Sequence, residues 1–138
     1  MALNTQVSNT VLTSEGNAAA SLFNTGYLRL YSGTQPTNAN TALAAQVLLC
    51  TLRFNATAFT NANGVLTANA ITSDTNAAAS GTASFFRAFQ SDGTTVLMDG
   101  TVGTSAANLI LPTTTITAGQ TVSCSSFVHT INGSTAGL

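Results

Sequence analysis

The sequence has 138 residues, a formal net charge of −1 and a charged fraction of only 5%. An ordinary soluble domain carries about 25% charged residues, so hydroxyl and amide groups must solvate most of this surface. The near-zero net charge gives no electrostatic reason to bind nucleic acid or an anionic membrane. A surface with so little charge repulsion favours a protein that works in a packed assembly over a freely diffusing enzyme.

The chain is long enough for a single domain with its own core. Its 44% hydrophobic residues argue against disorder, because disordered chains are poor in apolar residues. No apolar run approaches the length of a membrane span. The first residues also lack the basic and apolar regions of a signal peptide, so we do not expect export by the general secretory route.

Residues 1–26 are mostly small and polar, and they form an N-terminal arm ahead of the main domain. Ser14 is a candidate N-cap for a short helix over residues 15–23, with Glu15 in its first turn. An extended arm that crosses a neighbouring subunit fits the same composition. The sequence leaves both possibilities open.

The first predicted strand, residues 27–31, alternates cleanly between apolar and other side chains. Leu28 and Leu30 are expected to face the core, with Tyr27, Arg29 and Tyr31 on the outer face. Such a set fits an ordinary sheet surface and also a protein interface, where tyrosine and arginine are enriched at hot spots. We take Tyr27, Arg29 and Tyr31 as the candidate protein-interface residues.

The remaining predicted strands are short and separated by turn signals. They cover residues 47–54, 65–71, 80–90, 94–103, 108–112 and 120–131, with a β-prone polar stretch at 113–117, a flexible link at 72–82 and a flexible tail at 132–138. Seven or eight short strands at this spacing predict an all-β fold, an antiparallel β-sandwich of the jelly-roll type, over residues 27–131.

Asp92-Gly93 is the strongest hairpin signal in the chain. A loop with Gly93 in the left-handed conformation predicts that Gln90 pairs with Thr94. Phe86, Ala88, Val96 and Met98 then share the core face, and Arg87, Phe89, Thr95, Leu97 and Asp99 share the other. This register places Arg87 opposite Leu97 and diagonal to Asp99, so we predict a structural salt bridge between Arg87 and Asp99.

The sequence contains few candidate catalytic residues. The four acids are scattered: Glu15, Asp74, Asp92 and Asp99. His129 is the sole histidine, and no nucleophile elbow accompanies it. Cys50 and Cys124 lack metal-ligand spacing and are expected to be buried free thiols. We therefore predict no enzyme activity, no cofactor and no metal site.

Several tracts resemble small virion proteins of tailed bacteriophages: residues 28–36, 64–71, 81–87, 92–105 and 116–123. The likeness spans about residues 27–131, and its motifs are turn-and-strand signatures without catalytic content. It implies a capsid decoration (cement) protein on the outer capsid surface of the virion, made in the host bacterial cytoplasm. Its partner would be the major capsid protein. The resemblance also implies a homo-oligomer, with a trimer favoured, and no contact with nucleic acid or membrane.

Two other functions fit parts of the sequence. A receptor- or glycan-binding module of a tail or fibre would need exposed aromatic side chains beside Asp or Asn, and most aromatics here lie in predicted strands. A hydrolase built on His129 would need a carboxylate and a serine nearby.

Overall fold

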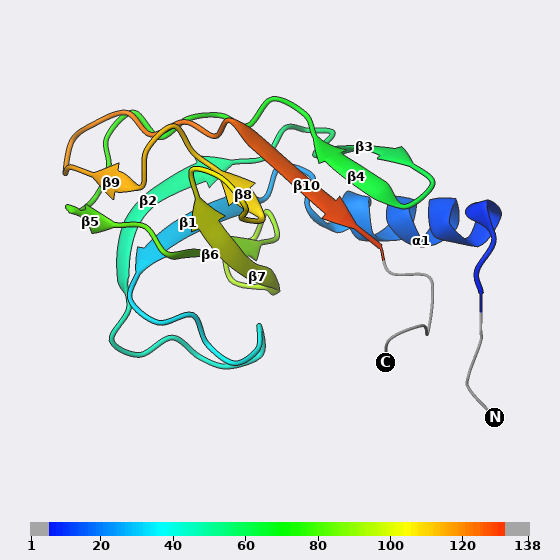
Figure 1. The fold of residues 1–138 in the computed structure, drawn as a ribbon, viewed down its shortest axis with the longest axis horizontal. Coiled ribbons are helices and arrows are strands. Elements are labelled where there is room, and N and C mark those ends of the chain that lie inside the picture. The colour runs from blue at the N-terminus through cyan, green and yellow to red at the C-terminus, as the bar shows by residue number, and fades with distance from the viewer. Residues whose placement is uncertain (1–5, 132–138) are drawn as a thin grey trace.

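The computed structural model describes residues 6–131, which fold into one helix and ten strands (Figure 1). The elements are α1 (Asn9–Leu22), β1 (Tyr27–Ser32), β2 (Val47–Arg53), β3 (Phe59–Ala62), β4 (Val65–Ala68), β5 (Gly81–Thr82), β6 (Phe85–Phe89), β7 (Val96–Gly103), β8 (Leu109–Ile110), β9 (Thr115–Ile116) and β10 (Ser126–Thr130). The predicted all-β class is confirmed.

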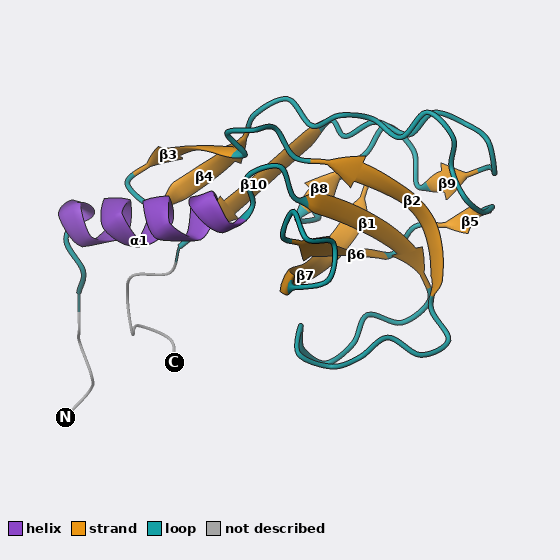
Figure 2. Cartoon of the chain, turned by 180° about the vertical axis from the view of Figure 1, so that it is seen from behind, coloured by secondary structure: helices purple, strands orange, loops and turns teal. Residues whose placement is uncertain are grey.

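Eight strands form one sheet in the order β2-β1-β6-β7-β8-β10-β4-β3, and β5 pairs with β9 in a separate ribbon. The large sheet curls into a half-barrel, which gives the fold its sandwich-like character (Figure 1). Its pairs are antiparallel except β7 with β8, which run parallel, so the sheet is mixed rather than purely antiparallel. The β5–β9 ribbon and α1 lie at opposite ends of the molecule (Figure 2).

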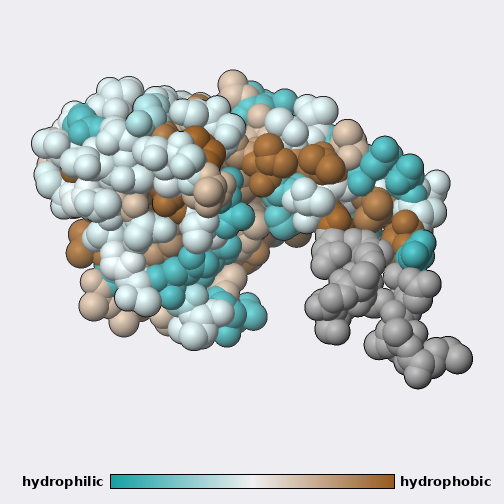
Figure 3. All heavy atoms as spheres, in the orientation of Figure 1, coloured by the Kyte–Doolittle hydropathy of each residue, from teal (hydrophilic) through white to brown (hydrophobic). Residues whose placement is uncertain are grey.

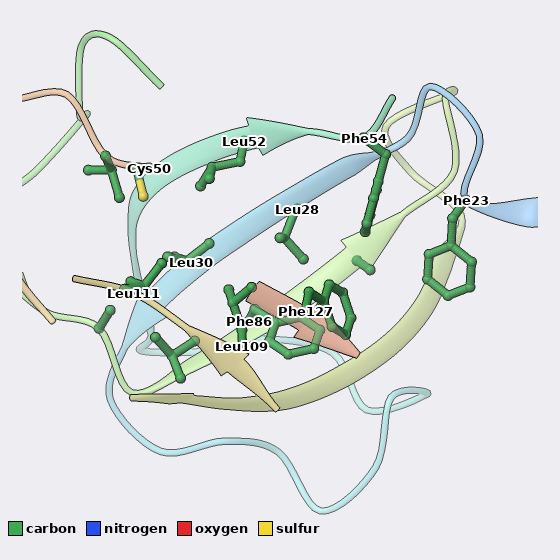
Figure 4. Close-up of a cluster of buried hydrophobic side chains, with 14 of the residues drawn as sticks. Phe23, Leu28, Leu30, Cys50, Leu52, Phe54, Phe86, Leu109, Leu111 and Phe127 are labelled. Carbon is green, nitrogen blue, oxygen red and sulfur yellow. The ribbon is translucent and has the colours of Figure 1, made fainter. Parts of the chain in front are cut away.

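The core fills the inside of the curl. Leu28, Leu30 and Phe86 point inward from β1 and β6, and Phe127 enters from β10 (Figure 4). The Phe127 ring lies 5.1 Å from the Phe86 ring and 5.6 Å from the Phe59 ring, measured between centroids. Phe127 thus links Phe86 on β6 to Phe59 on β3, across the two halves of the sheet.

The helix begins earlier than predicted. Ser8, not Ser14, is the N-cap, and its side chain accepts a hydrogen bond from the Val11 backbone N–H. Gly16 lies inside α1, where a Cβ would come within 2.6 Å of the Asn61 amide nitrogen on β3. This close approach explains why glycine, which usually weakens a helix, occupies position 16. The helical alternative is confirmed for residues 9–22; the other end of the predicted arm, residues 1–5, and the predicted tail, 132–138, lie outside the described residues.

The β6–β7 hairpin has a different register from the predicted one. Arg87 pairs directly with Asp99, and the Gln90 N–H donates to Thr95 rather than pairing with Thr94. Gly93 has the expected positive φ of 73°. The irregularity lies in the strand, where Leu97 is an extra residue between the Ala88–Met98 and Phe89–Val96 pairs.

The change of register has a local cause. The Asp92 carboxylate closes a wider loop by accepting hydrogen bonds from the Thr94 and Thr95 backbone N–H groups and from the Thr95 hydroxyl. Val96 consequently pairs with Phe89, so the prediction that it shares a face with Phe86 was wrong. A side-chain acceptor in a turn competes with the backbone ladder in this way.

Residues 72–82 are not an open link. The Asp74 carboxylate accepts hydrogen bonds from the Thr51 and Asn76 backbone N–H groups, at 2.8 and 2.9 Å. The backbone of Asp74 also forms a bridge with Val122. The segment therefore covers the outer edge of β2, which would otherwise present unpaired N–H and C=O groups.

Candidate protein interface

The outer face of β2, β1, β6 and β7 carries all three arginines of the chain. In one row across the strands, Tyr27 pairs with Arg53 and with Phe89. In the next row, Arg29 pairs with Arg87, which pairs with Asp99. Paired side chains point to the same side of a sheet. We call this surface the arginine–aromatic face, and its residues are Tyr27, Arg29, Tyr31, Arg53, Phe85, Arg87, Phe89 and Asp99.

The predicted salt bridge between Arg87 and Asp99 is present. Arg87 Nε lies 2.7 Å from Asp99 Oδ1, and Arg87 Nη2 lies 2.9 Å from Asp99 Oδ2. The two residues sit directly opposite each other, not diagonally, and both side chains are 4% exposed. The hydrogen bonds to Asp99 raise the pKa of Arg87. The pair is thus a buried, bidentate structural contact.

A long loop covers part of this face. Residues 33–46 run outside β6 and β7 (Figures 1 and 2), and the Thr41 carbonyl accepts a hydrogen bond of 2.7 Å from Arg87 Nη2. At its ends, the Gly33 carbonyl accepts from the Ser84 hydroxyl, and Gln46 Nε2 donates to the Thr34 carbonyl. We call this segment the strap. It places the Arg87–Asp99 pair between the sheet and a second layer of chain.

The prediction that Tyr31 is an exposed interface residue was wrong. Tyr31 is 6% exposed, and its ring stacks on Phe85 with 5.2 Å between centroids. Burial raises the pKa of its hydroxyl. Alternation correctly places Tyr31 on the outer face, but this part of the face is covered: Tyr31 packs against Phe85, and the strap lies over the neighbouring Arg87.

Tyr27 and Arg29 remain half-exposed, and Arg53 is exposed. The Arg29 guanidinium lies 4.4 Å from the Phe89 ring centroid and 5.7 Å from that of Tyr27. The Arg53 guanidinium lies 4.7 Å from the Tyr27 centroid. Both arginines therefore rest on aromatic rings with their charges open to solvent. Arg53 was missed from the sequence, although its outward position in the 47–54 strand was a usable signal.

Each exposed arginine is also held by a backbone acceptor. Arg29 Nη1 donates to the Gly93 carbonyl at 3.0 Å, and Arg53 Nε donates to the Thr25 carbonyl at 3.2 Å. Among residues 6–131, Arg87–Asp99 is the one ion pair. The charges of Arg29 and Arg53 are therefore not neutralised by any carboxylate in this part of the chain.

The other chemistry-bearing residues lie apart from this face. His129 pairs with Leu66 on β4, burial lowers its pKa, and its side chain makes no hydrogen bond within the described residues. Cys50 and Cys124 are free thiols; Cys50 is buried and Cys124 half-buried, and burial raises the pKa of Cys50 to about 12. Residues 6–131 hold no cluster of three metal-ligating side chains, and none of the helices described there is suited to cross a membrane.

Comparison with known proteins gives no relative. The chain matches no protein-family model, no curated protein and no solved structure. What it does must be inferred from its own residues. The feature that stands out is a half-exposed aromatic ring, Tyr27, flanked by two guanidinium groups that no carboxylate of residues 6–131 neutralises.

Proposed function

We propose that the protein is a capsid decoration (cement) protein of a tailed bacteriophage. It binds the outer surface of the head through non-covalent contacts with the major capsid protein, and it has no catalytic step. The tracts that resemble phage virion proteins support this identity. The structural observation that carries it is the exposed part of the arginine–aromatic face, namely Tyr27, Arg29 and Arg53.

This face has the composition of an interface hot spot. Tyrosine and arginine contribute most to binding when a partner removes them from water. On the side of the molecule seen in Figure 3, much of the surface has intermediate hydropathy, which suits close packing with few charges. A specific interface buries about 800 Å² per partner. Such added area raises the free energy needed to expand or rupture the shell.

In this proposal the protein acts as a homo-oligomer, a trimer, whose copies each contact neighbouring capsid subunits. Hydrophobic side chains gather beside β4, β10 and α1 (Figure 3). Val65 on β4 and Val128 on β10 are 39% and 44% exposed. This surface is separate from the arginine–aromatic face, so it supplies a contact between copies while Tyr27 and the arginines face the capsid.

The test is the location and copy number of the protein in purified virions. We expect quantitative mass spectrometry to find it in numbers that scale with the capsid subunits, and cryo-electron microscopy to place it on the shell. An Arg53→Gln variant should occupy the shell less, whereas the matched control Glu15→Gln, on α1, should occupy it fully. Density confined to the tail would overturn the proposal.

Tail-confined density would favour the receptor- or glycan-binding function instead. All nine aromatic side chains lie within residues 6–131; eight are buried and Tyr27 is half-exposed. One partly exposed ring is a small stacking surface for a sugar. A glycan array probed with the isolated protein separates the two functions, and we expect no specific binding.

A further inference from the structure

We infer that Tyr27, Arg29 and Arg53 receive an acidic segment of a protein partner, whose Asp or Glu carboxylates bind the guanidinium groups that flank the Tyr27 ring. The identity of the partner as a capsid protein rests on the proposed function. The chemistry of the site rests on the contacts of these three side chains alone.

The two arginines have hydrogen-bond donors to spare. A guanidinium group carries five N–H donors. Within residues 6–131, Arg29 donates from Nη1 to the Gly93 carbonyl and also contacts the Tyr31 hydroxyl, and Arg53 donates from Nε to the Thr25 carbonyl. The remaining N–H groups form the planar fork that binds a carboxylate in a bidentate manner.

The side chains are already ordered. Arg29 lies over both Phe89 and Tyr27, and Arg53 lies over Tyr27 from the neighbouring strand. Each is fixed at a second point by its backbone acceptor. A partner therefore need not immobilise two flexible side chains, which is one of the main costs of forming an interface.

The chain does not supply its own carboxylate to this site. Asp99 binds Arg87, Asp74 accepts from the Thr51 and Asn76 N–H groups, and Asp92 is occupied in its own turn. Glu15 lies on α1, which packs on β3 and β4. Asp92 adjoins Gly93 in the sequence, yet it forms no ion pair with Arg29.

Arg87 shows what the complete arrangement looks like. On the same face, its guanidinium binds the Asp99 carboxylate through Nε and Nη2 and also donates to the Thr41 carbonyl. Arg29 and Arg53 also donate to a backbone carbonyl, but they lack the carboxylate. Charge complementarity thus favours an acidic protein segment as the occupant. A nucleic acid is a poorer fit, because affinity for it grows with the number of phosphates neutralised and only two cations are free.

The experiment is a titration of the full-length, ¹⁵N-labelled protein followed by NMR at low salt. The probes are a hexaglutamate peptide, a hexaglutamine peptide of the same length, inorganic phosphate and a single-stranded oligothymidylate. We expect hexaglutamate to shift the Arg29 and Arg53 Nε–H signals and the Gly93 amide while leaving Arg87 unchanged. Added NaCl should weaken this response, and hexaglutamine should give none.

Two variants and one control sharpen the result. Arg53→Gln should weaken hexaglutamate binding about tenfold, and Arg29→Lys, which keeps the charge but loses the fork, should weaken it several-fold. Glu15→Gln should leave it unchanged. An amide spectrum like that of the wild type shows that each variant is folded.

The inference is overturned if hexaglutamate gives no response, if hexaglutamine gives an equal one, or if phosphate or oligothymidylate binds more tightly than hexaglutamate. These outcomes are independent of the virion measurement. A tail location with a normal hexaglutamate response refutes the proposed function and keeps the acidic-segment site. A shell location without a hexaglutamate response supports the proposed function and refutes the acidic-segment site.

Discussion

Breaking the Arg87–Asp99 pair tests whether the covered part of the arginine–aromatic face is a true interior. The proposed change is Asp99→Asn or Arg87→Met, each of which removes one charge and leaves its partner in place. Both side chains are 4% exposed and joined by two hydrogen bonds. Removing one member of such a buried pair costs about 3–5 kcal/mol, because the remaining charge is desolvated without a partner.

That loss is large beside the total stability of a domain, about 5–15 kcal/mol. For a chain of this size it corresponds to a fall in Tm of about 10–20 °C. The double variant Arg87→Met with Asp99→Leu removes both charges, and apolar replacements of buried pairs are often close to neutral. In the double variant only the Thr41 carbonyl loses its hydrogen-bond donor. We expect this loss to lower the free energy of unfolding by about 1–3 kcal/mol.

Urea unfolding followed by circular dichroism measures all three variants, with Arg53→Met as the exposed control. The control loses a ring contact and an exposed hydrogen bond to the Thr25 carbonyl, and it should lower the free energy of unfolding by about 1 kcal/mol. The charge-swapped pair, Arg87→Asp with Asp99→Arg, should recover only part of the loss, because a carboxylate at position 87 cannot donate to Thr41. Single variants that cost no more than the control, or a double variant that costs the sum of the singles, would refute the reasoning.

Three further predictions follow from other local contacts. Gly16→Ala should lower the free energy of unfolding by about 1–3 kcal/mol in a urea titration, the opposite sign from an ordinary helix, because the added Cβ meets the Asn61 amide at 2.6 Å; a gain in stability would contradict this. The hydrogen bonds from Thr95 and Thr94 hold the pKa of Asp92 at about 2, below its unfolded value. Its stabilising contribution is therefore complete above about pH 4 and is lost as the pH falls toward 2; an NMR titration of the carboxyl signal checks it, and a midpoint near 4 would exclude it. Cys50, with a pKa raised by burial to about 12, should resist iodoacetamide at pH 8 until the protein unfolds; mass spectrometry of the labelled protein reports the site, and rapid labelling of the native protein would disprove its burial.

The sequence was most informative where a local pattern decides the structure. The alternation in residues 27–31 correctly places Leu28 and Leu30 in the core. The pair Asp92-Gly93 correctly predicts a turn with a positive φ at the glycine. The pair Asn63-Gly64 likewise forms a tight turn, in which φ is 52° at Asn63 and 87° at Gly64. Side chains set these features within a few residues, so no knowledge of distant contacts is needed.

Features that depend on contacts with distant segments could not be predicted from the local sequence. Tyr31 is buried and stacks on Phe85, on a face where residues 33–46 fold back over Arg87. The local sequence around Tyr31 does not predict this distant contact. The β6–β7 register depends on an extra residue at Leu97, which a regular hairpin rule does not include. For the candidate interface, alternation predicted the outward positions of Tyr27 and Arg29. Alternation also indicates an outward Arg53, but only the pairing of β1 with β2 places Arg53 beside Tyr27.

The position of β10 has a consequence for how the chain reaches its folded state. This strand joins β8 on one side and β4 on the other, so it alone connects the β2-β1-β6-β7-β8 half of the sheet to the β4-β3 half. Its Phe127 also completes the core. During synthesis, β4 and β8 therefore wait with open edges until residues 126–130 leave the ribosome. The pairing of β4 with β10 joins segments far apart in the sequence and is therefore slow to form, so the nascent chain is most exposed to aggregation just before β10 arrives.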